Sequence, residues 1–100
     1  MPLKLAKVRG NSMLPRFRPG DYILASRPIL RAFKAGDIVL ARHQAHGLIL
    51  KRIQRLTDDE VWLEGLNELS STAASLGAMP RTALIGRVCY HLPRRKPVSN

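Results

Sequence analysis

The apolar positions of the chain fall into short runs that are separated by turn residues. Runs rich in Val, Ile and Leu predict strands at residues 22–25, 38–42, 48–56, 61–64 and 83–90. No stretch keeps a helical period over about eleven residues, so helices contribute little. Turn signals recur about every ten residues, which is typical of small all-β domains. The pattern therefore predicts a mostly β fold, with a small antiparallel sheet that is partly closed like a barrel.

Gly, Pro and Asp mark the connections between these strands. The turns are predicted at residues 19–21, 34–37, 44–47 and 57–60. The third and fourth would close β-hairpins, and Asp58, Asp59 and Glu60 would form an exposed turn. Residues 67–80 are rich in Ser, Ala and Thr without a clear period. They predict a long loop with at most one short helical turn.

Length and composition limit the class of protein. A chain of 100 residues with 45% hydrophobic and 24% charged residues is expected to form one globular domain, here residues 1–92, followed by a loose basic tail at 93–100. The longest purely apolar runs have four residues, far fewer than the roughly 18 of a membrane-spanning helix. The N-terminus has no apolar stretch of signal-peptide length. A single cysteine, Cys89, excludes an internal disulfide. We expect a soluble cytoplasmic protein.

The charge is strongly basic and unevenly distributed. The formal net charge is +10, and residues 56–80 hold five acidic residues and no basic one. Such a balance is compatible with an anionic surface or nucleic acid as a partner. Aromatic residues make up only 5% of the chain and do not alternate with the basic ones, so stacking on bases has little support. A solvated basic surface is the simpler interpretation.

One lysine stands where a strand should be apolar. Alternate residues of a strand share a face, so Lys51 lies between Ile49 and Ile53. Its side chain either extends to water at a sheet edge or is desolvated. Desolvation disfavours the ammonium form and lowers the lysine pKa, and a neutral amine is a competent general base.

A serine on a tight turn is the second candidate for chemistry. Gly10 and Asn11 permit an unusual backbone just before Ser12, and Pro15 restricts the backbone after it. A serine held there, with backbone N–H groups facing outward, suits a nucleophile beside an oxyanion site. The alternative is a helix-capping serine. Ser-Lys pairs are a known variant of the serine nucleophile and its base, so the two candidates support each other.

The histidines do not suggest another catalytic group. His43, His46 and His91 have no aspartate at a spacing that would orient an imidazole. Together with Cys89 they could bind zinc, but their spacings match no common zinc motif. The sequence therefore predicts neither a metal nor a cofactor.

Five motifs in order resemble those of the type I signal peptidases. They are Ser-Met-Leu-Pro at 12–15, Gly-Asp-Ile-Val at 36–39, Leu-Lys-Arg-Ile at 50–53, Gly-Leu-Asn at 65–67 with serines at 70 and 71, and Leu-Ile-Gly-Arg-Val at 84–88. The resemblance spans about residues 8–88. Residues 39–43 and 50–53 are similar to the small soluble maturation proteases of nickel-type superoxide dismutases. LexA-like self-cleaving repressors have a similar fold and a similar Ser-Met-x-Pro motif, but match residues 65–88 less well.

The resemblance implies a fold of the signal peptidase or LexA C-terminal type and a Ser-Lys dyad. Ser12 would be the nucleophile, and its backbone N–H, beside Asn11, would contribute to the oxyanion site. Lys51 would be the general base, and Ser71 or Ser70 would hydrogen-bond the lysine. No cofactor is implied.

The implied function is that of a serine endopeptidase that removes an extended N-terminal pro-segment from a protein substrate. The precursor of a nickel superoxide dismutase is the expected substrate. The chain departs from the family at Gly10, at Leu66 and at residues 73–75, where Ala-Ala-Ser stands in place of Asp-Ser-Arg. Two alternatives remain open: a non-catalytic basic binding module on the same fold, and a self-cleaving regulator.

Overall fold

Seven strands form one antiparallel sheet. The computed structural model describes residues 3–10, 12–27, 32–66 and 76–93. The strands are β1 (Leu3–Lys7), β2 (Tyr22–Ser26), β3 (Ile38–His43), β4 (Gly47–Leu56), β5 (Glu60–Glu64), β6 (Met79–Pro80) and β7 (Leu84–Leu92), with a short 3₁₀-helix η1 (Arg81–Ala83) before β7. Their order in the sheet is β1-β2-β7-β3-β4-β5-β6. The prediction of a mostly β, partly closed antiparallel domain is confirmed.

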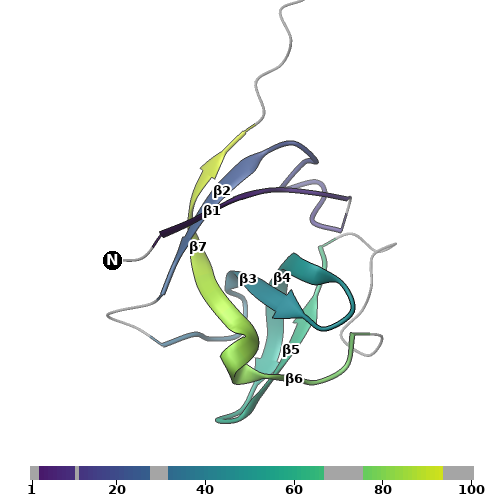
Figure 1. Cartoon of the computed structure of the whole chain (residues 1–100), viewed down its shortest axis with the longest axis vertical. Coiled ribbons are helices and arrows are strands. Elements are labelled where there is room, and N and C mark those ends of the chain that lie inside the picture. Colours follow the sequence, from purple (N-terminus) through teal and green to yellow (C-terminus); the bar gives the residue numbers. More distant parts are fainter. Residues whose placement is uncertain (1–2, 11, 28–31, 67–75, 94–100) are drawn as a thin grey trace, which may run out of the picture.

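Strand β7 joins the two halves of the sheet. Its second half pairs with β2, from Tyr22 opposite Leu92 to Ser26 opposite Arg87. Its first half pairs with β3, from Val39 opposite Arg87 to Ala41 opposite Leu84. Figure 1 shows β7 running from the β3–β6 half to the β1–β2 half, so that the sheet curls. The end of β1 thereby comes to face the β3–β4 hairpin.

Strand β3 lies at the centre of the fold and is buried on both faces. Ile38 and Leu40 belong to one apolar cluster, together with Met13 and Phe17 of the loop after β1. Val39 and Ala41 belong to a second cluster on the other face, together with Ile53 and Leu63. A strand covered on both sides needs apolar residues at every position, which explains the uninterrupted Ile-Val-Leu-Ala run.

The sequence patterns locate most strand centres and miss the chain ends. Strand β1 was not predicted, although its Leu-Lys-Leu-Ala-Lys sequence alternates; Leu3 and Leu5 are each 56% exposed, because the strand lies at the sheet edge. The loop prediction for 67–80 is wrong at Met79 and Pro80, which pair with β5 as β6. Residues 67–75 and 94–100 lie outside the described residues. Among the described residues, no helix is long and apolar enough to cross a membrane.

Gly86 allows β7 to approach β2 closely. A Cβ atom at this position would lie 3.0 Å from the backbone carbon and oxygen of Ser26. We expect Gly86→Ala to lower the free energy of unfolding by roughly 1–3 kcal/mol, because backbone atoms cannot move aside cheaply. Urea denaturation measures the effect. Cys89→Ser, at an exposed position of the same strand, is the control and should change stability by less than about 0.5 kcal/mol. Equal stability of Gly86→Ala and the parent would contradict the close approach.

Candidate active site

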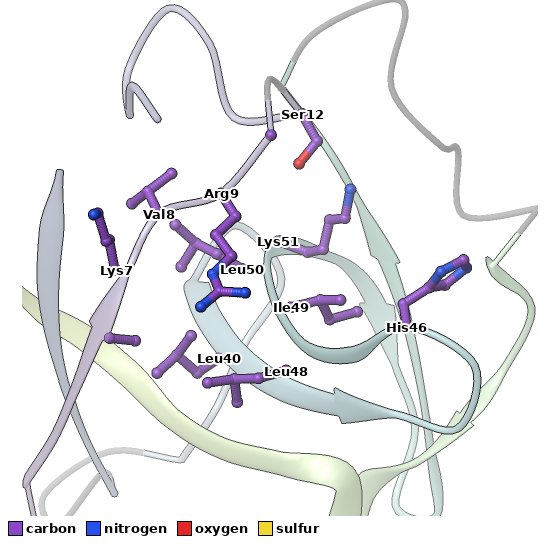
Figure 2. A pocket seen from close by; sticks show the side chains of 12 residues that line it. Lys7, Val8, Arg9, Ser12, Leu40, His46, Leu48, Ile49, Leu50 and Lys51 are labelled. Atoms are coloured by element: carbon purple, nitrogen blue, oxygen red, sulfur yellow. The ribbon is translucent and has the colours of Figure 1, made fainter. Parts of the chain in front are cut away.

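A cavity of about 570 Å³ opens between the two halves of the sheet. One wall comes from the end of β1 and the residues after it, and the other from β3, the hairpin turn and β4. The lining residues are Ala6, Lys7, Val8, Arg9, Gly10, Ser12, Leu40, His46, Leu48, Ile49, Leu50 and Lys51. Figure 2 shows these side chains gathered around the opening between the two walls. Both residues of the predicted dyad line this one cavity.

Ser12 is held by a loop whose ends and interior are fixed. The chain turns at Gly10, where φ is +71°, a conformation that L side chains rarely adopt. The Leu66 N–H donates a hydrogen bond of 2.7 Å to the Ser12 carbonyl oxygen, which ties the loop to the end of β5. Met13 and Phe17 anchor the loop in the core with exposed fractions of 1% and 2%. Ser12 itself is half-buried at the cavity wall.

Lys51 is buried on the face that the sequence predicted. It pairs with Val39 across the β3–β4 ladder, and its side chain is directed to the same side as Ile49 and Ile53. Only 6% of Lys51 is exposed. Burial in this apolar environment disfavours the ammonium form and lowers the pKa of Lys51. In Figure 2 the Lys51 amine and the Ser12 hydroxyl point toward one another.

Two equivalent aspartate turns fix the positions of β2 and β3. The Arg18 N–H donates to the Asp21 carboxylate and the Lys34 N–H donates to the Asp37 carboxylate, each at 3.0 Å. Both aspartates come directly after a glycine of positive φ. The backbone pairing is also the same: Gly20 and Asp21 oppose Val8, and Gly36 and Asp37 oppose Ile53, as in a β-bulge. Val8, which lines the cavity, and Ile53, two residues after Lys51 on β4, are therefore held by the same type of backbone pairing.

Each of these buried aspartates contacts a cationic or titratable side chain of β7. Asp21 lies 2.7 Å from Nε2 of His91, and Asp37 lies 3.3 Å from an Arg87 nitrogen. The His91 ring also packs against Phe17, with ring centroids 4.6 Å apart. The interpretation that no aspartate orients a histidine is wrong for His91. The pair is 70 residues apart in sequence, so spacing gave no signal. His91 does not line the Ser12 cavity and instead supports the Ser12 loop through Phe17.

The remaining candidate residues from the sequence lie either outside the described residues or in roles other than the predicted ones. Asn11, Ser70, Ser71 and residues 73–75 lie outside the described residues. His43 accepts hydrogen bonds at Nδ1 from the Ala45 and His46 N–H groups and closes the hairpin turn. His46 lines the cavity, a position that the sequence did not predict. Within the described ranges, no group of three or more His, Cys, Asp or Glu side chains is arranged to hold a metal ion.

The fold and the cavity together define a class of protein. A curled antiparallel sheet that brings a serine and a buried lysine into one cavity is the arrangement expected of a serine peptidase with a Ser-Lys pair. The sequence profile of the Peptidase S24-like family matches residues 2–89, and the chain belongs to this family. The family has the serine protease fold of LexA and the signal peptidases. No curated protein shows significant sequence similarity to the chain.

We expect Asp21→Ala to destabilise the protein. The change removes the buried acceptor of the Arg18 N–H and the partner of His91, and an unsatisfied buried group costs about 1–3 kcal/mol. Urea denaturation gives the difference in the free energy of unfolding. Asp58→Ala, at an exposed position of the β4–β5 turn, should change it by less than about 0.5 kcal/mol. Similar losses in the two variants would show that the Asp21 contacts contribute nothing.

We expect Lys51→Met to stabilise the protein near neutral pH. Burial lowers the pKa of Lys51 in the folded state, so below that pKa the folded protein carries the full cost of a desolvated ammonium. Stability should therefore rise with pH from the lowered pKa up to the unfolded value of about 10.4. Methionine lacks this cost. The stability difference between variant and parent should thus shrink as the pH is raised, and a constant difference would contradict the argument.

Proposed function

We propose that the protein is a serine endopeptidase in which Ser12 is the nucleophile and Lys51 the general base. The observation that carries the proposal is the approach of the Ser12 hydroxyl and the Lys51 amine from opposite walls of one cavity (Figure 2). The lowered pKa of Lys51 supports it, because only the neutral amine accepts a proton. Membership of the Peptidase S24-like family agrees with this chemistry.

The reaction would proceed by acyl transfer. Neutral Lys51 accepts the Ser12 hydroxyl proton while the Ser12 oxygen bonds to the carbonyl carbon of the substrate. The backbone N–H of Ser12 faces the developing oxyanion. As the tetrahedral intermediate collapses, the carbon–nitrogen bond breaks and Lys51 gives its proton to the leaving amine. A water molecule then attacks the acyl-enzyme, again with Lys51 as base, and releases the acid product and Ser12.

Two strand edges next to Ser12, each without a partner in the part of the chain that the structure describes, suit an extended substrate. In the described part of the chain, β1 pairs with β2 alone. Residues 47–51 of β4 pair with β3 on one side, whereas β5 begins its pairing with β4 at Arg52. Among the described residues these two edges have no further strand partner, and residues of both edges line the cavity. A peptide in the extended conformation would bind there as an added strand, with its side chains alternately directed into the cavity.

The finer proposal concerns the substrate. The similarity of residues 39–43 and 50–53 to maturation proteases of nickel-type superoxide dismutases favours a dismutase precursor with an N-terminal pro-segment. Self-cleavage, as in LexA-like repressors, is the competing proposal. Incubation of the purified protein alone and with such a precursor, followed by mass spectrometry, separates them: new precursor fragments support the first, and fragments of the peptidase chain support the second.

Removal of either dyad side chain should abolish cleavage. We expect Ser12→Ala and Lys51→Met each to lower turnover by more than about 1000-fold, and the double variant to be no worse than either, since the two residues act as one unit. Lys51→Arg should also be inactive, because guanidinium stays protonated. The measurement is the rate of precursor cleavage, or of cleavage of a peptide library if the precursor is not cut. A folded Lys51→Met variant near the parent rate would refute the mechanism.

The pH profile of the parent gives an independent readout. Activity should rise with pH as Lys51 loses its proton, and it should level off below the roughly 10.4 of a free lysine, because burial lowers the pKa. The triple change of Asp58, Asp59 and Glu60 to Ser is the control, since these exposed residues lie on the β4–β5 turn. It should leave rate and profile within a few-fold of the parent.

A further inference from the structure

Beside Ser12 the cavity has a cationic wall. Lys7 and Arg9 both line it, and both are exposed at its mouth. Figure 2 shows the Arg9 guanidinium reaching across in front of Leu50, between the β1 wall and the β4 wall. No Asp or Glu is among the described residues that line the cavity. A cleft lined by one sign of charge favours a ligand segment of the opposite sign.

The described carboxylates are engaged or placed elsewhere. The ion pairs within the described ranges join Arg52 to Glu64, Arg87 to Asp37 and His91 to Asp21. The remaining described acidic residues form the exposed β4–β5 turn. Lys7 and Arg9 take part in none of these pairs, so their charges at the cavity are not neutralised by a described carboxylate.

We propose that Lys7 and Arg9 select an acidic peptide segment next to the scissile bond. The inference rests on the proposed peptidase function and names the chemical class of its substrate. Arg9 precedes Ser12 by three residues and Lys7 by five. At about 3.3 Å per extended residue they lie within roughly 10 and 16 Å of the nucleophile. Because the chain turns at Gly10, these distances are upper limits, and a substrate strand paired with this edge presents Asp or Glu to them within about five residues of the cleaved bond.

The charges of Lys7 and Arg9 would affect which substrate segments are preferred and how fast the substrate binds. Exposed ion pairs contribute little each and are screened by salt. Together, Lys7 and Arg9 should favour an acidic over a basic segment by about tenfold in kcat/KM at low ionic strength. The preference should decline as salt is added. Hydrogen bonds between the substrate backbone and the strand edges are not screened by salt as ion pairs are. Cleavage should therefore continue at high salt, where the preference for acidic segments is lost.

The test compares two charge-reversal pairs. Lys7→Glu/Arg9→Glu changes the cavity mouth, whereas Lys4→Glu/Arg27→Glu makes the same change in net charge at a separate surface hollow formed by Leu3, Lys4, Ala25, Arg27, Thr82, Leu84 and Ile85. Each variant is incubated with a library of short randomised peptides, and cleavage products are identified by mass spectrometry. We expect the parent and the Lys4/Arg27 variant to prefer acidic segments, and the Lys7/Arg9 variant to lose or reverse that preference.

Binding separates this inference from the proposed function. Fluorescence anisotropy of labelled acidic and basic peptides is measured on the Ser12→Ala protein, with and without Lys7→Glu/Arg9→Glu. Tighter binding of acidic peptides that is lost on Lys7→Glu/Arg9→Glu supports the proposed selection by Lys7 and Arg9. If the parent protein at the same time cleaves no peptide, the proposed peptidase function is rejected and the selection stands. If the parent protein cleaves peptides without any preference for acidic segments, the proposed selection by Lys7 and Arg9 is wrong and the proposed peptidase function stands. An equal loss of preference in both charge-reversal pairs also overturns it, because net charge would then explain the effect.

Discussion

The fold depends on the way β7 is held by two buried aspartates. Asp21 directly precedes β2 and contacts His91, and Asp37 directly precedes β3 and contacts Arg87. The two partners lie four positions apart on one strand, and the two aspartates lie at matching turns, so β2 and β3 are fixed along β7 by the same interaction. Gly86, between the two halves, lets β2 come within van der Waals contact. These contacts hold both halves of the sheet on β7, and in the curled sheet the end of β1 lies opposite β4 (Figure 1).

The curl has a thermodynamic consequence at Lys51. Lys51 is only 6% exposed, and this burial opposes the charged form of its amine and lowers its pKa. The fold therefore carries at this position a side chain whose charged form its burial disfavours. Such a local conflict between stability and sequence is typical of functional sites. The burial that destabilises the ammonium is the same property that would let the amine act as the proposed general base.

Local rules were sufficient for residues whose environment is set by near neighbours. The alternation of residues 49–53 placed Lys51 on the same face as Ile49 and Ile53 but left its burial open, and Gly10 marked the turn before Ser12. Contacts between distant segments carry no such signal. The Asp21–His91 pair spans 70 residues, and the entry of His46 into the cavity results from the curl of the whole sheet. The Met79–Pro80 strand was missed because two residues form no period, and its pairing with β5 is decided by tertiary contacts.

The lysines of the edge strand β1 relate both to its exposure and to the cavity beside Ser12. An exposed edge invites pairing with other chains, and lysines on such an edge oppose aggregation. Lys4 and Lys7 both occur on β1, but they point to opposite faces because side chains alternate. Only Lys7 lines the Ser12 cavity, and the alternation continues to Arg9. A charge that merely kept the edge soluble would serve equally on either face. Because Lys7 and Arg9 line the cavity, the charges that protect this edge would also serve the proposed preference for an acidic strand.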